Sequence, residues 1–304
     1  DHTKLIDMLT DLNDYSIGIE DVLKEHFDEE NIVYWMAFQI LMGNVDTQNR
    51  NVYLYSPLNS DIWYFIAWDN DGCLMRPEYE LRNFSDQNSW EKGISNYWGN
   101  ILFQRCLKSR SFREKLNDAI LDLREYLNKD MLTSKIESYK NVLKPYLYLM
   151  PDAEYEPLTS EQYDQIAASL PDEIEKNYQL YLESLETPMP FYIGVPTIDG
   201  DKLKFNWDVS YDLDAEDITY SVEVAGDYLF RDVIYQNTTL TVPEAEMDLP
   251  KAGQYFVRVR ATNTSGKTQD AFDYYVTDEG KYYGMRCFYI TEDSTVEEDD
   301  YEEG

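Results

Sequence analysis

The sequence predicts a multidomain α+β protein, in which a mostly helical part with one β-hairpin precedes an all-β part. The length of 304 residues corresponds to about two domains of roughly 150 residues each. Apolar residues recur at helical spacing through much of the first 186 residues, and short strand-like runs follow the Pro-rich linker Thr187-Pro188-Met189-Pro190. We therefore expect one domain at 1–187, a second at 188–290 and an acidic tail at 291–304.

The composition narrows the classes of partner. Acidic residues outnumber basic ones 59 to 26, which gives a net charge of −33. Nucleic acids and anionic membranes are therefore poor partners, whereas cations and basic proteins are suitable ones. No apolar run is long enough to span a membrane. The chain begins at Asp1 with no visible signal peptide, so we expect that a leader was removed or that the chain is an excised piece.

Cysteine and histidine give little support for redox or zinc chemistry. The three cysteines, Cys73, Cys106 and Cys287, form no disulfide framework, and they leave the redox compartment undecided. His2 and His26 are the only histidines, and neither lies in a catalytic or zinc-binding motif. We expect both to be structural or at the surface.

The first 42 residues are expected to be helical. Leu5, Met8, Leu9 and Leu12 share one helix face. Asp28-Glu29-Glu30 is a suitable acidic start for a further helix, and the segment 32–42 is apolar nearly all round. This second segment predicts a buried helix that leads directly to Gly43 and Asp46.

A β-hairpin should follow. Runs 51–55 and 63–68 are rich in Tyr, Trp, Val and Ile, and the residues between them, 56–61, favour a turn. If Tyr55 faces Trp63, Asn51 lies opposite Ala67 at the strand end that precedes Asp69. In extended backbone, Asp69 and Asp71 point to one side. The hairpin therefore predicts that four side chains gather at one edge: Asp46, Asn51, Asp69 and Asp71.

These residue types suit divalent metal chemistry. Mg²⁺ prefers carboxylate and amide oxygens, and phosphoryl transfer uses such an ion together with a carboxylate that positions the attacking hydroxyl. An Asp, an Asn five residues later, and a strand that ends in Asp follow the order of a protein-kinase catalytic loop and its metal-binding Asp. The usual His-Arg before the first Asp is absent, and Asp69-Asn70-Asp71-Gly72 replaces Asp-Phe-Gly.

These carboxylates have two other interpretations. The plain alternative is an acidic hairpin with solvated side chains. A calcium loop of the EF-hand type does not fit, because Cys73 and Leu74 occupy the positions that need an oxygen ligand and a glycine.

At the level of motifs, the chain resembles the CotH kinase family. The resemblance rests on Gly43-Asn-Val-Asp46, Asn51-Val-Tyr-Leu-Tyr55 and Trp63 to Gly72, and it covers roughly residues 1–186. It implies an atypical, partial kinase-like fold that is secreted or displayed on a bacterial cell or spore surface and phosphorylates Ser on a protein substrate. It also implies ATP with Mg²⁺ or Mn²⁺, and the family's two essential aspartates match Asp46 and Asp69. Together with the grouping at the hairpin edge, this leads us to expect Asp46 to be catalytic and Asp69, Asn51 and Asp71 to be metal ligands.

The part of a kinase that holds the nucleotide is not visible in the sequence. Before Asp46 the only lysines are Lys4 and Lys24, and the only glycines are Gly18 and Gly43. None lies in a strand-like or Gly-rich context of the kind that holds phosphates. We therefore expect this chain to be the C-lobe portion of the fold and to be inactive alone. The alternative is a non-catalytic surface or adhesion protein on a degenerate kinase scaffold.

More helices are expected between residues 98 and 186. Ser111 and Glu114 fit a capping box that starts one of them, with Leu116, Ile120, Leu123 and Leu127 facing inward. Another is expected from Thr133 to Leu149. The stripe on this second helix predicts core packing of Ile136, Tyr139, Leu143 and Tyr146. Residues 73–97 are predicted as an irregular stretch, which is either a substrate-binding segment or an ordered surface loop.

The last domain is predicted as an immunoglobulin-like β-sandwich. Trp207 and the run 255–263 resemble a fibronectin type III domain, with Tyr255, Val257 and Val259 inward and Arg258 and Arg260 outward. We expect a solvated loop in preference to a Ca²⁺ site at four nearby acidic residues, Asp212, Asp214, Glu216 and Asp217. From 292 onward the acidic tail is expected to be disordered.

Overall fold

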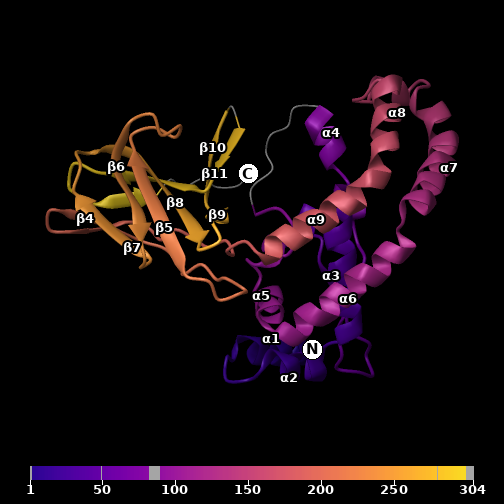
Figure 1. Ribbon diagram of the computed structural model, residues 1–304, viewed down its shortest axis with the longest axis horizontal. Helices are drawn as coiled ribbons and strands as arrows, with labels where there is room; N and C mark the ends of the chain where they lie inside the picture. The colour runs from indigo at the N-terminus through magenta and orange to yellow at the C-terminus, as the bar shows by residue number, and fades with distance from the viewer. Residues whose placement is uncertain (1, 49, 82–89, 279, 299–304) are drawn as a thin grey trace. The chain divides into compact units, whose positions relative to one another are not determined.

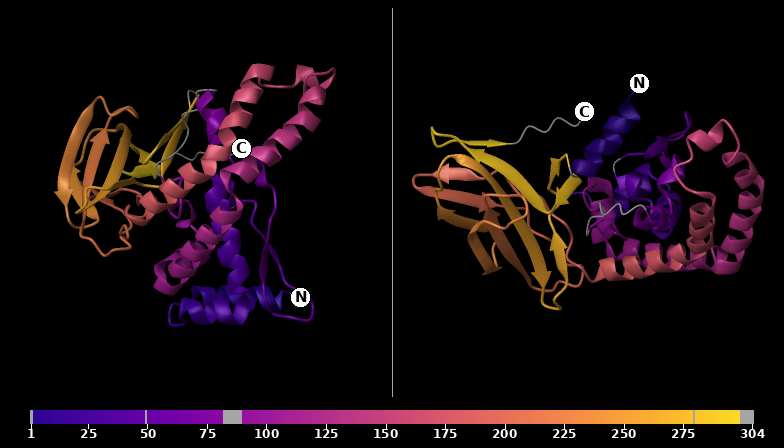
Figure 2. Two further views of the ribbon diagram at one scale, coloured as in Figure 1. Left: turned by 45° about the vertical axis from the view of Figure 1, so that its right-hand side comes forward. Right: turned by 90° about the horizontal axis from the view of Figure 1, so that it is seen from above.

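The protein is described by a computed structural model, which covers residues 2–48, 50–81, 90–278 and 280–298 (Figures 1 and 2). The chain divides into two compact units, 1–85 with 92–183 and 86–91 with 184–304, and each is considered by itself. The first is helical with one hairpin and the second contains antiparallel sheets, so the α+β prediction is confirmed. Among the described residues, no helix has both the length and the apolar character that crossing a membrane requires.

The first unit is built from helices of very different length. Its α-helices are α1 (Thr3–Asn13), α2 (Ile19–His26), α3 (Glu29–Met42), α4 (Arg76–Leu81), α5 (Ile101–Lys108), α6 (Arg110–Tyr126), α7 (Lys129–Leu147), α8 (Ser160–Ser169) and α9 (Glu173–Leu185). Its short 3-10 helices are η1 (Val45–Gln48), η2 (Asn70–Gly72), η3 (Ser95–Tyr97), η4 (Asp152–Glu154) and η5 (Leu170–Asp172). The hairpin strands are β1 (Tyr53–Tyr55) and β2 (Tyr64–Ile66).

Helix α3 is the buried centre of this unit, as its sequence predicts. Asp28 caps it by accepting the backbone N–H of Asn31 at 2.9 Å. Trp35 lies at the middle of an aromatic cluster, with ring centroids 4.7 Å from Phe65 of β2 and 5.7 Å from Phe103 of α5. Gly43 ends the helix with a φ of 60°, a conformation that glycine adopts without a steric penalty.

The hairpin forms, but its register differs from the one considered above. Tyr55 pairs with Tyr64, one residue later than Trp63, and the paired strands are three residues long. Contacts distant in sequence fix this register. Asn31 bonds both the N–H and the carbonyl of Phe65, at 2.6 and 3.2 Å, and Lys4 donates to the carbonyls of Pro57 and Ser60 in the turn.

Helices α6 and α7 differ in how far their apolar side chains are buried. Leu116 and Ile120 of α6 are fully buried, as predicted. The cap of α6 is Ser109, which accepts from Phe112 N–H at 3.2 Å, so the predicted capping box at Ser111 is wrong. Helix α7 has no buried residue, and the side chains expected in the core are exposed: Tyr139, Leu143 and Tyr146. Figure 2 shows α7 and α8 side by side as a helical hairpin.

Part of the stretch predicted to be irregular is regular structure. The stretch after the hairpin contains the short helix α4 and the 3-10 helix η3, while residues 82–89 lie outside the described part. His26 is buried and bonds Asp11 at 2.7 Å, which confirms a structural role.

The second unit forms two facing sheets. Its strands are β3 (Thr197–Asp199), β4 (Lys202–Asn206), β5 (Ile218–Ala225), β6 (Val233–Leu240), β7 (Glu244–Asp248), β8 (Gly253–Asn263), β9 (Thr268–Asp270), β10 (Tyr274–Thr277), β11 (Gly280–Tyr283), β12 (Met285–Ile290) and β13 (Val296–Glu298). One sheet has the order β13-β12-β8-β5-β6, with β9 beside β8, and the other has β3-β4-β7. Strands β10 and β11 form a separate antiparallel pair.

Side chains from both sheets share one core. Phe205 of β4 contacts Phe288 of β12, and Trp207 contacts Tyr220 of β5, with ring centroids 6.0 and 5.5 Å apart. Val257 and Val259 are buried as predicted. The outward Arg258 and Arg260 pair with Glu223 and Asp270.

The acidic segments of this unit are more ordered than the sequence suggested. Asp212 is buried and accepts from the N–H groups of Asp214 and Glu216 and from Asn263, so it holds a turn together. The expectation that the whole tail after 292 is disordered is wrong for residues 296–298, because β13 pairs with β12. Residues 299–304 lie outside the described part.

Candidate functional site: an acidic edge beside the hairpin

The first loop of the candidate site leaves the C-terminal end of α3. Asn44 is buried and donates to Gln39 Oε1 at 2.9 Å, while its backbone N–H donates to the Gln39 carbonyl at 3.0 Å. The N–H of Asp46 donates to Asn44 Oδ1 at 3.3 Å. A buried amide side chain therefore sets the backbone of Asp46 and leaves its carboxylate exposed.

The buried hydroxyl groups of Thr47 and Tyr97 help to fix this loop. Thr47 Oγ1 lies 3.0 Å from Tyr97 Oη and donates to the Asn44 carbonyl at 3.1 Å. Asn96 donates to the Val45 carbonyl at 3.3 Å. Burial raises the pKa of Tyr97, so its hydroxyl stays protonated and remains a hydrogen-bond donor.

The second loop, Asp69 to Gly72, is not extended as the sequence argument assumed. Asp69 has a φ of 48°, and Asn70–Gly72 form the 3-10 helix η2. A left-handed Asp followed by a tight turn changes the direction of the chain, so alternation along a strand does not apply here. Asn70 Oδ1 accepts from Gln39 Nε2 at 3.1 Å and faces Asn44 Nδ2 at 3.5 Å, which joins the second loop to the first.

Gly72 is the point of closest approach between the loops. A Cβ atom on Gly72 would lie 2.9 Å from both Asn44 Oδ1 and Asp46 Oδ2. Real Cβ atoms do not approach neighbours this closely, so any larger residue would displace one of these side chains. The glycine thus permits Asp46 to lie against the second loop.

The three carboxylates interact electrostatically. The negative charge of Asp71 is the largest cause of a raised pKa at Asp69, followed by desolvation, a hydrogen bond with Asp71 and the charge of Asp46. Burial raises the pKa of the neighbouring Cys73 to about 12, so this residue is a neutral thiol and a poor metal ligand. The edge is therefore a concentration of negative charge that a cation would relieve.

The predicted ligand set is only partly assembled. Asp69 interacts electrostatically with both Asp71 and Asp46. Asn51 has a φ of 53°, and in the described part of the chain its side chain makes no hydrogen bond with any of the three. Among the described residues there is also no group of three or more His, Cys, Asp or Glu arranged to hold a metal ion. The roles assigned to these four residues stay predictions.

Sequence reasoning missed the residues that support the loops. On α9, Asn177 donates to the Leu41 carbonyl at 2.9 Å and accepts from Arg76 at 2.6 Å. Arg76 also pairs with the buried Glu173 at 3.1 Å. These contacts join α4 and α9 to the end of α3 just before Asp46. Because the residues joined by these bonds are about a hundred positions apart in sequence, no local sequence pattern could have indicated the bonds.

Comparison with known proteins gives one informative match. The sequence model of a family described as "CotH kinase protein" matches residues 1–181. No curated protein is matched. Among solved structures, the chain is similar to one titled "Structure of surface layer protein SbsC, domains 1-6", at 12% identity and a TM-score of 0.17. That match covers 90% of this chain and 38% of the other chain, and at this score it carries no argument.

Proposed function

Because the chain belongs to the CotH kinase family, which matches it over residues 1–181, we propose that it is part of an atypical protein kinase of the bacterial cell surface or exterior. On this proposal, residues 1–187 are the C-lobe portion, and the full activity transfers the ATP γ-phosphate to Ser of a protein substrate. The observation that carries the proposal is the approach of Asp46 to the Asp69–Gly72 loop at Gly72.

Asp46 is the residue that would position the acceptor hydroxyl. Its backbone is fixed by Asn44, while its carboxylate is exposed and free to accept a hydroxyl proton in a hydrogen bond. Asp69 and Asp71, from the second loop, would hold the divalent ion, with Asn51 at the periphery.

The residues present fit a magnesium or manganese ion that is shared with a nucleotide. Mg²⁺ commonly uses one or two protein carboxylates together with substrate phosphates, and it does not need a complete protein cage. The paired Asp69 and Asp71 match that requirement. A bound ion would neutralise charge on the transferring phosphoryl group. We therefore expect weak binding of the ion alone and tighter binding with ATP.

A non-catalytic scaffold is the second candidate. The contacts of Lys4 favour it for this chain in the absence of any other segment. Phosphate binding in kinases uses a strand-borne Lys. Lys4 belongs to helix α1 and is held in the hairpin turn by three acceptors, on Ser56, Pro57 and Ser60. It is therefore not available for a nucleotide in this arrangement.

For the second unit we propose a fibronectin type III-like module that presents or spaces the first. The two-sheet arrangement with a shared core is compatible with such a module. Modules of this architecture bind or space other parts, so we assign it no chemistry.

Calorimetric titration with Mn²⁺, with and without a non-hydrolysable ATP analogue, tests the metal assignment. Asp69→Asn should weaken Mn²⁺ binding at least tenfold, about 1.4 kcal/mol. Asp61→Asn is the matched control, because Asp61 is an exposed carboxylate in the turn of the same hairpin. It should bind as the wild type does. Equal affinity in wild type and Asp69→Asn would rule the metal site out.

Incubation with radiolabelled ATP tests whether the chain is active by itself. The 304-residue chain alone should label neither itself nor added protein, since Lys4 is committed to the turn. Robust labelling that is abolished by Asp46→Asn would show that the chain by itself is an active kinase.

A further inference from the structure

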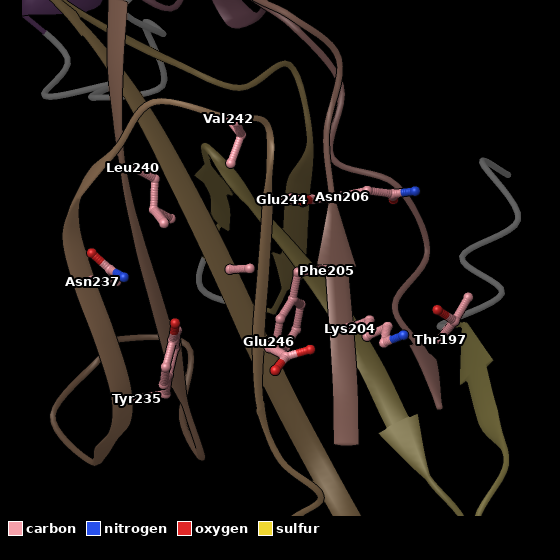
Figure 3. Close-up of a pocket in the computed structure, with 11 residues that line it drawn as sticks. Thr197, Lys204, Phe205, Asn206, Tyr235, Asn237, Leu240, Val242, Glu244 and Glu246 are labelled. Atoms are coloured by element: carbon pink, nitrogen blue, oxygen red, sulfur yellow. The ribbon is translucent and has the colours of Figure 1, made fainter. Parts of the chain in front are cut away.

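A groove on the second unit has no role in the proposed phosphoryl chemistry. It has a volume of about 530 Å³, within the usual range for ligand sites. Figure 3 shows Tyr235, Asn237 and Leu240 of β6 on one side, and Lys204 and Asn206 of β4 on the other. Val242 and the β7 residues Glu244, Ala245 and Glu246 complete the lining, with Phe205 at the centre and Thr197 beyond β4.

The groove lies between two open strand edges. Strand β6 is the last of its sheet, and β7 is the last of the facing sheet. Within the described residues, no strand pairs with the outer edge of either. Each edge therefore presents a row of backbone N–H and carbonyl groups that a further strand could pair with.

Strand β6 extends beyond the cover of the facing sheet. Tyr220, Val222 and Val224 of β5 are buried, at 3%, 0% and 0% exposure. Their partners on β6 are Leu240, Asn237 and Tyr235, which share the same face and are only partly buried. The inner face of β6 thus packs on the core through Tyr235 and Leu240 but is only partly covered, and these residues also line the groove.

The sequence of β6 lacks the usual protection of an edge. Its eight residues, Val-Ile-Tyr-Gln-Asn-Thr-Thr-Leu, contain no charged residue and no proline, in a chain that is 28% charged. Edge strands that must not pair normally carry such residues. By contrast, the edge strands β7 and β13 carry acidic residues. The free edge of β6 is therefore suited to pairing.

The rim of the groove is acidic. The ammonium of Lys204 is hydrogen-bonded to Asp199 at 2.5 Å, and its pKa is raised by that bond, with smaller effects from Glu246 and Glu244. Asp199 thus pairs with the one ammonium group of the lining, and the carboxylates of Glu244 and Glu246 remain as excess negative charge. A basic partner would be attracted, whereas a second copy of a chain with net charge −33 would be repelled.

We propose that this groove binds an extended, basic peptide segment of another protein, which adds a strand to the free edge of β6. Backbone hydrogen bonds to β6 would supply affinity. Alternate side chains would enter the groove over Phe205 and Leu240, and the basic side chains would meet Glu244 and Glu246. The second unit would then be a peptide-docking module.

The test uses the whole 304-residue chain and a fluorescent eight-residue peptide that alternates Val with Lys. Fluorescence anisotropy should show saturable binding. Hydrogen exchange at 233–240 should slow when the peptide is present, because the outer amides of β6 become paired. A peptide that is N-methylated along one edge should bind at least tenfold more weakly, and so should one that alternates Val with Glu.

Matched charge reversals locate the binding site. Glu246→Lys should weaken binding of the Val–Lys peptide at least fivefold. Asp201→Lys makes the same charge change at an exposed residue outside the groove, and should bind within twofold of wild type. Unchanged thermal unfolding of both variants would show that they remain folded.

Several results would overturn the proposal. One is absence of binding at millimolar peptide. Others are equal binding of the N-methylated and parent peptides, which would indicate charge attraction alone, or unaltered exchange at 233–240. Sedimentation that shows a dimer which Thr238→Pro dissociates would identify a second copy of the chain as the occupant.

Discussion

Replacing Asn177 by alanine should destabilise the first unit and loosen the candidate site. Asn177 is 4% exposed. Its Nδ2 donates to the Leu41 carbonyl at 2.9 Å, and its Oδ1 accepts from the Arg76 guanidinium at 2.6 Å. The Asn177 amide also lies against Gly43, where a Cβ would approach it to 2.7 Å. One side chain thus supports the end of α3 that leads to Asp46.

The size of the effect follows from these two hydrogen bonds. A neutral bond contributes about 1 kcal/mol and one to a charged group about 1.5–3 kcal/mol, so the loss should be about 2.5–4 kcal/mol. Gln179→Ala on the same helix is the control, because Gln179 is exposed and, within the described residues, its side chain bonds only Glu175, one turn away. That change should cost less than about 0.5 kcal/mol.

Hydrogen exchange under increasing urea measures both variants, because two units need not unfold in one transition. Amides of α3 and α9 should lose protection earlier in Asn177→Ala than in the wild type. If Asn177→Ala and Gln179→Ala are equally stable, the support assigned to Asn177 is wrong.

Four other substitutions give clear expectations. Leu116→Ala, at a fully buried site, should cost about 2.7–5 kcal/mol in urea unfolding, whereas Leu143→Ala, at 51% exposure, should cost less than about 1 kcal/mol; a large loss at Leu143 would place α7 in a core. Trp207→Ala should cost about 3–5 kcal/mol by leaving a cavity in the sandwich. Unfolding monitored at the β8 amides measures this loss, and a smaller one would contradict the prediction. Hydrogen bonds from Ser265 and Thr264 lower the pKa of Glu216 below 4.5, so its stabilising effect is complete above that value and is lost as the pH falls through the lower folded-state pKa. Glu216→Gln should therefore melt below wild type at neutral pH, and the difference should vanish in strong acid.

The strongest local signals predicted the fold correctly. Asp28 caps α3, the apolar run after it is buried, and Gly43 ends the helix. All three signals lie within one short segment of sequence, so they could be recognised locally. The hairpin itself followed from its strand and turn residues. Its register did not, because Lys4 and Asn31, distant in sequence, bond its turn and its second strand.

The helical period of α7 predicted a helix but not its burial. Tyr139, Leu143 and Tyr146 recur at helical spacing, yet all three are more than half exposed. A periodic apolar stripe shows that one face is apolar, and it does not supply the element that would cover it.

The candidate site was predictable only at its motif residues. The spacing of Asp46 and Asp69 identified the two loops. The amides that join them, on Gln39, Asn44 and Asn70, lie in a buried polar network whose geometry depends on tertiary packing. The position of Asn51 was inferred from a register that differs from the observed one.

Anomalous diffraction from crystals of the 304-residue chain soaked in Mn²⁺ with an ATP analogue tests the central claim most directly. The account predicts a manganese peak between the carboxylates of Asp69 and Asp71, with the nucleotide phosphates on its open side and Asp46 facing them. A nucleotide bound elsewhere, or manganese bound away from Asp69 at saturating concentration, would contradict it.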